Sequence, residues 1–304
     1  MNNKVKGMVV AKLPHRKINW IPYIFLFPIL FMLGGIFIYP ICVAIRLSFY
    51  NAQMASFSNA KYIGLQNYWN ILHDPFFWSS LKLTLIYSVC TVIGSYVVGL
   101  FLAVMLNNRF KGRAFARAII VLPWAIPDLA ALLIWGWMFD PQYGILNYLL
   151  WSAGIVQQGF SWLSNTSMAM PSILIVTIWK WFPFSALILL AGLQSIPQDL
   201  YEAAYIDGAN RIQCFFNITL PGLRAVSKIL LLLLSVWSFG SFVIIYILTG
   251  GGPARATETL SIQVYMKAFR FGQVGEADAL GMFLLLIALV FSIVYFKFIL
   301  KEES

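Results

Sequence analysis

Charged residues, histidine and cysteine are all scarce in this sequence. Only 11% of its 304 residues are charged and 61% are hydrophobic, whereas soluble domains carry roughly 25% charged residues. A water-soluble core of this length could not hide so much apolar surface, which excludes an ordinary soluble domain. The three cysteines give neither a disulfide framework nor a metal-ligand spacing, so no metal site is predicted.

Several catalytic motifs are also missing. The sequence holds no glycine-rich phosphate loop, so the chain should not hydrolyse ATP by itself. Its only histidines, His15 and His73, form no HExxH pair, which argues against a membrane metalloprotease. Few acids fall in apolar runs: Asp128 is the clearest, and Glu276 and Asp278 stand at the mouth of the last run. Because these motifs are missing, we predict no catalytic residue. A proton-driven carrier commonly shows a chain of buried acids or histidines, so we expect the energy source to lie outside this chain.

Six apolar runs are long enough to cross a bilayer, which takes about 20 residues per helix. They cover Trp20–Val43, Leu81–Leu106, Ala114–Phe139, Met168–Gly192, Ala225–Leu248 and Ala279–Phe298. Pro and Gly inside the third, fourth and fifth runs are tolerated in membranes, because neighbouring helices and local adjustments satisfy the freed backbone groups. We predict an all-α, polytopic membrane protein with six transmembrane helices.

The basic residues indicate the orientation of these helices. The formal charge of +10 is not gathered on one face, as a nucleic-acid-binding surface would require. Most Lys and Arg fall on the side of the N-terminus, namely Lys4, Lys6, Lys12, Arg16, Lys17, Arg109, Lys111, Arg113, Arg117, Arg211, Arg224, Lys228, Lys297 and Lys301. By the positive-inside rule both termini face the cytoplasm. The basic segment 1–19 precedes an apolar run that is too long for a signal peptide, so this run should stay attached as the first span.

The outer segment 48–80 is rich in aromatic residues, among them Tyr62, Tyr68, Trp69, Phe76, Phe77 and Trp78. Aromatic side chains at this depth usually form an interfacial belt at the membrane surface. Contact with an external partner is the second interpretation of the same residues.

A cytoplasmic loop, 193–224, separates the fourth and fifth runs. Pro197 is placed to open a helix, and Asp199 and Glu202 put negative charge in its first turns, where the helix dipole favours it. Gly208 is placed to end the helix in a left-handed conformation, and a second short helix follows from about Asn210. We therefore predict a helix–turn–helix at the inner membrane face.

This loop resembles the EAA loop of binding-protein-dependent ABC importer permeases. The matching residues are Glu202-Ala203-Ala204, Gly208, Ile218 and Leu220-Pro221. In that family the loop is the coupling helix, which inserts into a cleft of a separate ATPase subunit, with the Glu pairing a basic residue there. The resemblance implies that the ATPase-docking residues are Tyr201, Glu202, Ala203, Ala204, Asp207 and Gly208. The alternative is an ordinary amphipathic connecting helix.

Other segments resemble the carbohydrate branch of the same family, which includes maltose, trehalose and glycerol-phosphate permeases. They are residues 248–253 (LTGGGP), 257–259 (TET), 122–127 (LPWAIP) and 179–184 (WKWFPF). The resemblance implies a type I ABC importer permease domain over residues 20–304, in a bacterial or archaeal cytoplasmic membrane. It implies three kinds of partner: a second permease subunit, two ATPase subunits that bind ATP and Mg, and an extracytoplasmic solute-binding protein. The chain itself would need no cofactor.

The resemblance also implies a solute site in the fourth and fifth runs. The family's sugar-contacting positions fall on Thr177, Lys180, Trp181, Phe184, Trp237, Ser238 and Ser241. Aromatic faces and hydroxyls would suit an oligosaccharide, a disaccharide or an acidic sugar derivative, whereas simple helix packing is the alternative. Lys180 lies near the middle of its run, where a cation is costly. It could pair with an anionic group of the solute, pair with an acid of the protein such as Asp128, or snorkel. A secondary carrier or channel that works without an ATPase is the alternative function.

Overall fold

The computed structural model describes residues 21–108 and 110–297. The basic segment 1–19 and the predicted span ends Trp20 and Phe298 lie outside this part. The chain divides into two compact units, residues 1–44 and 45–304, and each is described by itself. The N-terminal unit is helical, with α1 (Ile21–Leu33) and the π-helical turn η1 (Gly34–Ile38) leading into α2 (Tyr39–Leu47).

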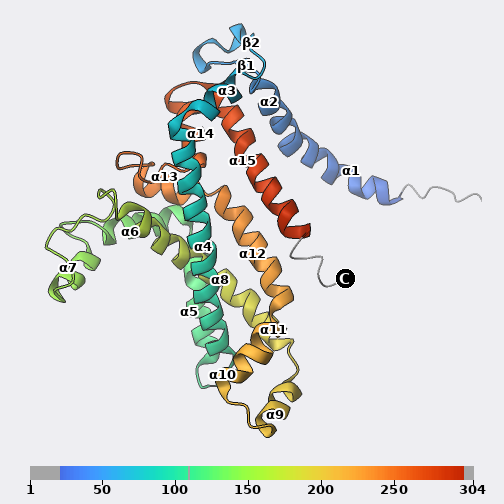
Figure 1. The fold of residues 1–304 in the computed structure, drawn as a ribbon, viewed down its shortest axis with the longest axis vertical. Coiled ribbons are helices and arrows are strands. Elements are labelled where there is room, and N and C mark those ends of the chain that lie inside the picture. Colours follow the sequence, from blue (N-terminus) through green and yellow to red (C-terminus); the bar gives the residue numbers. More distant parts are fainter. Residues whose placement is uncertain (1–20, 109, 298–304) are drawn as a thin grey trace, which may run out of the picture. The chain divides into compact units, whose positions relative to one another are not determined.

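The second unit is also almost wholly helical (Figure 1). Its first elements are β1 (Tyr50–Asn51), η2 (Met54–Asn59), β2 (Lys61–Tyr62), α3 (Gln66–His73), α4 (Pro75–Asn107), α5 (Arg113–Ala125), α6 (Asp128–Met138), α7 (Ile145–Ser152) and α8 (Ala169–Gln194). The remaining elements are α9 (Gln198–Ile206), α10 (Arg211–Cys214), η3 (Phe215–Thr219), α11 (Leu220–Gly222), α12 (Arg224–Phe239), α13 (Val243–Thr249), α14 (Leu260–Tyr265), η4 (Met266–Arg270) and α15 (Val274–Tyr295).

Helices α4 and α8 form the centre of this unit and pack along much of their length. Small residues allow the close approach: a Cβ added to Gly99 of α4 would lie 2.5 Å from the Cβ of Ser185 on α8. Close packing of this kind, through small residues, is typical of helix pairs in membranes. Helix α12 closes the core on one side, where Leu230 and Leu234 are fully buried with Leu189 of α8.

The predicted membrane helices are present, with two corrections. Within the described residues, four helices are long and apolar enough to span a membrane, and two further spans result if each of two bent helix pairs counts as one. The predicted third run is one of these pairs, because α5 and α6 meet at 93°. The break lies at Ile126 and Pro127, which are both extended. A proline disfavours helical geometry in the residue before it, which explains why the helix stops at Ala125.

The predicted fifth run is also discontinuous. Helix α12 ends at Phe239, Gly240 follows, and α13 starts separately at Val243. On its other side α12 is bent by 66° from the α10–α11 segment. Glycine lowers helix stability because it loses the most backbone freedom on folding, so Gly240 is a natural place for the break.

Two helices start earlier than hydropathy indicated. Helix α4 begins at Pro75 because Asp74 caps it, accepting a hydrogen bond from the Phe76 amide at 2.9 Å. Helix α15 begins at Val274, so the acidic Glu276 lies in its first turn, where the helix dipole stabilises it. In both cases polar residues that favour a helix start lie outside the apolar run.

The segment 48–80 folds against one end of α4 and α15, whereas α9 and α10 lie at the opposite end of α4 (Figure 1). Strands β1 and β2 pair Tyr50 with Tyr62, and Phe77 and Ile71 of this segment are buried beside Leu280 of α15. Tyr62, Trp69, Phe76 and Trp78 remain exposed. These four residues are available to a membrane interface or to a partner, and both interpretations stay open.

Candidate functional site

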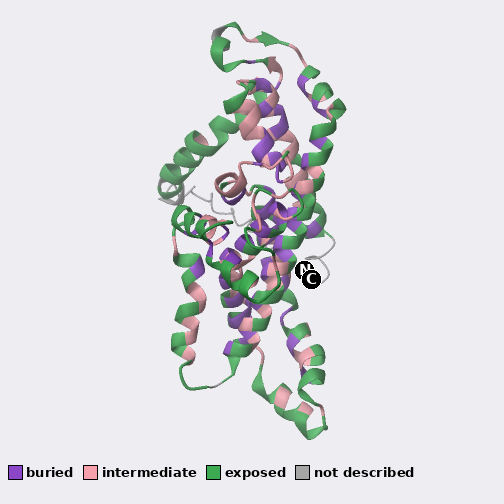
Figure 2. Cartoon of the chain, turned by 90° about the vertical axis from the view of Figure 1, so that its left-hand side faces the viewer, coloured by how far each residue is buried: buried purple, intermediate pink, exposed green. Residues whose placement is uncertain are grey.

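Residues 198–222, from α9 to α11, form what we call the docking segment. Helix α9 begins directly after Pro197, which is extended, and Asp199 lies in its first turn. Helix α9 has no buried residue. It lies at the lower end of the molecule in Figure 1, and the same end of Figure 2 lacks the colour of buried residues. Apolar side chains are exposed on this helix, above all Ile206 at 86%. A short helix with bare apolar and acidic side chains has the composition of a contact surface.

The end of α9 is a Schellman turn, which fixes the direction of the chain. Gly208 has a φ of 84°, and its amide donates to the Tyr205 carbonyl at 3.1 Å. The Ala209 amide donates to the Ala204 carbonyl at 2.9 Å. These two hydrogen bonds and the left-handed glycine define the motif. The sequence prediction for Gly208 is therefore confirmed in its backbone conformation.

The start of α10 is equally well defined. The side chain of Asn210 accepts from the Gln213 amide at 2.9 Å, and the Gln213 side chain accepts from the Asn210 amide at 2.7 Å. This reciprocal pair is a capping box. The predicted second helix is thus present, and it continues through η3 into α11. Tyr201 ties the two halves together, because its hydroxyl lies 3.0 Å from the Thr219 hydroxyl.

The predicted docking residues fall on two sides of α9. Exposed residues are Glu202, Ala203, Asp207 and Gly208, and half-buried ones are Tyr201 and Ala204. Glu202 accepts a hydrogen bond from Gln198 at 3.0 Å on the exposed surface of the helix. Tyr201 is turned inward to Thr219, so its side chain supports the segment from within. The assignment of all six residues to ATPase docking stays a prediction.

Lys180 of α8 reaches the break between α5 and α6, an arrangement that we call the lysine clamp. Its ammonium lies 3.0 Å from the Asp128 carboxylate and also donates a hydrogen bond to the Ile126 carbonyl. The Lys180 side chain is 9% exposed and the Asp128 side chain 53%. The break leaves the Ile126 carbonyl without a partner in the helix ladder, and the ammonium supplies one. The internal ion pair that the sequence offered as one alternative is therefore formed.

Three of the predicted solute residues form an aromatic cluster between α8 and α12. The ring centroids of Phe184 and Trp237 are 5.0 Å apart, and those of Trp181 and Trp237 are 6.3 Å apart. Trp124 of α5 extends the cluster, 6.3 Å from Phe184. Trp237 is 45% exposed, which leaves much of its ring accessible. Accessible aromatic faces are the part of this region that could stack on a sugar ring.

The predicted hydroxyl residues lie deeper. Thr177 and Ser238 are fully buried, and the Ser238 hydroxyl donates to the Ser235 carbonyl at 2.8 Å. The hydroxyl of Tyr87, on α4, joins Thr177 at 3.2 Å to Ser241 at 2.7 Å. A solute would reach Thr177 or Ser238 only after the surrounding helices move. Sequence reasoning missed Tyr87, although a phenol hydroxyl within an apolar run usually finds a partner when it is buried.

Comparison with known proteins identifies the family. The profile of the family described as "binding-protein-dependent transport system inner membrane component" matches residues 95–301. The chain belongs to this family. Its match runs from the middle of α4 to the C-terminal end and includes both the docking segment and the lysine clamp.

Individual relatives align with nearly the whole chain. It is 36% identical over 289 residues to the trehalose/maltose transport system permease protein MalF of Thermococcus litoralis, covering 95% of this chain and 96% of that protein. It is 34% identical over 276 residues to the sulfoquinovosyl glycerol transport system permease protein SmoG of Agrobacterium fabrum, covering 91% and 89%. The chain is thus similar to sugar transport permeases along its length.

A solved structure confirms the predicted fold. A bacterial ABC transporter involved in the import of the acidic polysaccharide alginate aligns with a TM-score of 0.77 over 94% of this chain and 96% of that one, at 24% identity. The fold is therefore that of an ABC importer permease, as the sequence predicted. Among the residues that the structure describes, no group of three His, Cys, Asp or Glu side chains could hold a metal ion.

Proposed function

We propose that this chain is the membrane-spanning permease subunit of an ATP-driven carbohydrate importer. It would form half of the translocation pathway and receive a separate ATPase subunit on the docking segment. The observation that carries the proposal is the geometry of α9: an uncovered helix that presents Glu202 next to a Schellman turn. Family membership supports the same function, because relatives of this family are transport permeases.

The proposed cargo is an oligosaccharide, a disaccharide or an acidic sugar derivative. The names of two relatives give trehalose or maltose and sulfoquinovosyl glycerol as their cargo, and the alginate importer carries an acidic polysaccharide. The cluster of Trp181, Phe184 and Trp237 supplies aromatic faces of the kind that stack on sugar rings. With Lys180 already paired to Asp128, the aromatic cluster carries most of the argument for a solute contact.

The proposed assembly has four further subunits besides this chain. A second, related permease would complete the pathway, and two ATPase subunits would bind ATP and Mg, so that this chain needs no cofactor of its own. A solute-binding protein would deliver the sugar from outside the cytoplasmic membrane. One solved neighbour is in complex with a periplasmic protein that holds an alginate pentasaccharide, which supports this last partner. Docking of the ATPase on α9 requires that both termini face the cytoplasm.

The docking proposal is tested by reversing one charge on α9. We expect Glu202→Lys to lower solute uptake and solute-stimulated ATP hydrolysis at least tenfold, because the reversed charge would repel a basic residue in the ATPase cleft. The matched control is Asp199→Lys, on the same helix and also exposed. Asp199 lies nearer the N-terminus of α9, so its reversal disturbs the helix dipole more than reversal of Glu202 does.

The two variants separate docking from helix stability. If Glu202→Lys abolishes uptake while Asp199→Lys retains most of it, the docking assignment holds. Equal losses in both variants would mean that α9 merely has to be folded, and the assignment would be wrong. Uptake that persists in membranes without any ATPase would instead favour a secondary carrier or channel.

A further inference from the structure

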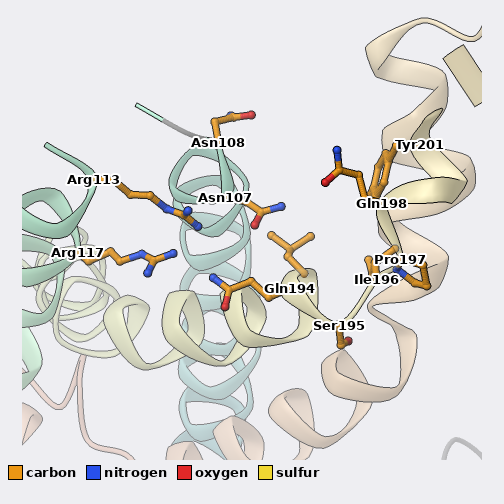
Figure 3. A pocket seen from close by; sticks show the side chains of 11 residues that line it. Asn107, Asn108, Arg113, Arg117, Gln194, Ser195, Ile196, Pro197, Gln198 and Tyr201 are labelled. Atoms are coloured by element: carbon orange, nitrogen blue, oxygen red, sulfur yellow. The ribbon is translucent and has the colours of Figure 1, made fainter. Parts of the chain in front are cut away.

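A cavity of about 850 Å³ lies at the base of the docking segment (Figure 3). Its walls come from the end of α4, the start of α5, the end of α8 and the first turns of α9. Arg113 and Arg117 project from α5 on one side, and Gln198 and Tyr201 of α9 stand on the other (Figure 3). The volume is in the range of small-molecule sites, which is roughly 300–1,000 Å³.

The lining of this cavity is basic and rich in hydrogen-bond donors. None of the 11 residues that line it is acidic, whereas two are arginines. The amides of Asn107, Gln194 and Gln198 and the hydroxyl of Tyr201 add neutral donors. The two guanidinium groups give this lining a positive potential that would attract an anion.

Arg117 has side-chain donors that no acceptor in the described part of the chain satisfies. Its Nε and Nη2 atoms are buried and have no hydrogen-bond partner within the described part of the chain. Arg113, by contrast, is held in place by a hydrogen bond from its Nε to the Leu106 carbonyl at 2.6 Å. Buried guanidinium donors without an acceptor are unfavourable, and a phosphate group offers several acceptors in a geometry that fits the planar fork. A phosphate in the cavity would reach these two nitrogens only if the Arg117 side chain turned toward it, and it would then satisfy donors that the described part of the chain leaves without an acceptor.

The cavity is also connected to the proposed docking surface. Gln198 lines the cavity and donates to Glu202 through the same amide nitrogen that a bound anion could engage. Tyr201 also lines the cavity, and its hydroxyl is hydrogen-bonded to the Thr219 hydroxyl, so Tyr201 links α9 to η3. An occupant that draws the Gln198 side chain into the cavity would break its hydrogen bond to Glu202. The Glu202 carboxylate on the proposed docking surface would then be free to take another position.

We propose that this cavity is a regulatory site for a phosphomonoester group, held by Arg117 and Arg113, and that its occupation alters docking at α9. Binding depends only on the cavity, whereas the effect on ATP hydrolysis rests on the proposed function. The phosphomonoester could belong to a free metabolite or to the headgroup of a lipid, since both present the same chemistry to the two guanidinium groups.

The binding test uses the full chain, purified with the subunits that accompany it, in nanodiscs of phosphatidylcholine. Glucose 6-phosphate and inorganic phosphate are titrated by calorimetry, and glucose is the control that lacks the phosphate. We expect saturable binding of both phosphates, no effect of glucose on their binding, and at least tenfold weaker phosphate binding in Arg117→Gln, because charge-assisted hydrogen bonds are lost. Lys111→Gln, an exposed cation just before α5, is the matched control and should bind as wild type does.

A second set of nanodiscs, containing phosphatidic acid, distinguishes the two sources. If a lipid headgroup occupies the site, phosphatidic acid will abolish the binding of glucose 6-phosphate in wild type. If the ligand is a free metabolite, that binding will be unchanged. Either result supports the site, provided that Arg117→Gln binds phosphate more weakly in phosphatidylcholine.

Three results would overturn the proposal. Equal phosphate affinity in wild type and Arg117→Gln would remove the site. Binding that appears only after the ATPase subunit is stripped away would mean that the ATPase supplies the anion itself. Binding without any change in ATP hydrolysis would remove the regulatory role. If the proposed docking through Glu202 is wrong, phosphate binding measured by calorimetry will still be seen. Failure of the docking proposal can therefore be distinguished from failure of the phosphate site.

Discussion

The docking segment and the lysine clamp differ in how they are held. Helix α9 of the docking segment has no buried residue, and the turns of the segment are closed by hydrogen bonds between near neighbours, as in the capping box of Asn210 and Gln213. The lysine clamp lies largely inside the helix bundle and joins Lys180 to residues of the third span, more than 50 positions away in sequence. The first region is built by local signals and the second by packing.

Because of this difference, substitutions in the two regions should affect different properties: the stability of the helix bundle, or the coupling of ATP hydrolysis to transport. A substitution on the exposed surface of α9 should leave the helix bundle intact, because α9 contributes no buried residue to it. A substitution in the clamp should weaken the bundle, because it leaves a buried group without its partner. We expect the free energy of unfolding to change most for a substitution in the clamp, less at Tyr87 and least at Gly208.

The largest change is expected for Lys180→Met. It removes the ammonium that pairs with Asp128 and satisfies the Ile126 carbonyl. We expect a destabilisation of about 2 kcal/mol, mainly from the Ile126 carbonyl left without its partner, because the ion pair to the half-exposed Asp128 contributes only about 0–1 kcal/mol. The measurement is the unfolding of the purified protein in mixed micelles of increasing SDS content.

Two further variants control this result. Lys82→Met, an exposed lysine on α4, should change stability by no more than about 0.5 kcal/mol. The double variant Lys180→Met/Asp128→Leu should recover only a small part of the loss, with a coupling of about 0–1 kcal/mol. If Lys180→Met is as stable as wild type and lowers the uptake of acidic sugars alone, Lys180 serves the solute and not the break.

Tyr87→Phe is expected to have an intermediate effect. It removes the hydroxyl that joins Thr177 to Ser241, while Thr177 keeps its own hydrogen bond to the Ile173 carbonyl at 2.8 Å. We expect a destabilisation of about 1 kcal/mol, typical of one buried hydrogen bond. The same unfolding measurement applies, with Tyr143→Phe at an exposed position as the control. A loss no greater than that of Tyr143→Phe would show that the network adds nothing to stability.

The smallest change in unfolding is expected for Gly208→Pro, although its effect on coupling should be large. Proline fixes φ near −65°, whereas Gly208 has a φ of 84° and donates its amide to Tyr205. The Schellman turn would be lost, and we expect ATP hydrolysis to become independent of solute while the unfolding midpoint stays close to that of wild type. ATPase activity of the reconstituted complex measures the first, and SDS titration the second.

Gly208→Asn is the matched control for this position. Asparagine tolerates the left-handed conformation better than other residues with a side chain, and a Cβ at this glycine would meet open space. Coupling should therefore survive in Gly208→Asn. If it survives equally in Gly208→Pro, the direction of the chain after α9 does not matter for docking, and the contrast between the two regions fails.

Sequence reasoning succeeded where the determining interactions are short in range. Pro197, Gly208 and Asn210 act on the backbone within one turn, so the helix–turn–helix was predicted with its turn residue. Hydropathy found the four helices that are long and apolar enough to span a membrane, whereas the third and fifth predicted runs are broken into separate helices. It failed at the ends of α4 and α15, where polar caps extend a helix beyond its apolar part.

Breaks and contacts between helices were harder to predict. Pro183 lies inside α8 without interrupting it, whereas α5 ends just before Pro127, so a proline in an apolar run does not by itself decide between a continuous helix and a break. The sequence left three alternatives for Lys180, and only the packing of α8 against α5 brought it to Asp128. The solute and docking roles of the predicted residues remain predictions.

The sequence by itself determined the class of protein, its apolar runs of bilayer length and the position of the docking segment. These follow from composition and from signals that act over a few residues. The tertiary structure alone decided the 93° break, the partner of Lys180, the place of Tyr87 and the arginine-lined cavity. The partner of Lys180, the place of Tyr87 and the cavity depend on side chains that are far apart in sequence, such as Tyr87 and Ser241 at a separation of 154 residues. Such pairs meet only after the helices have packed.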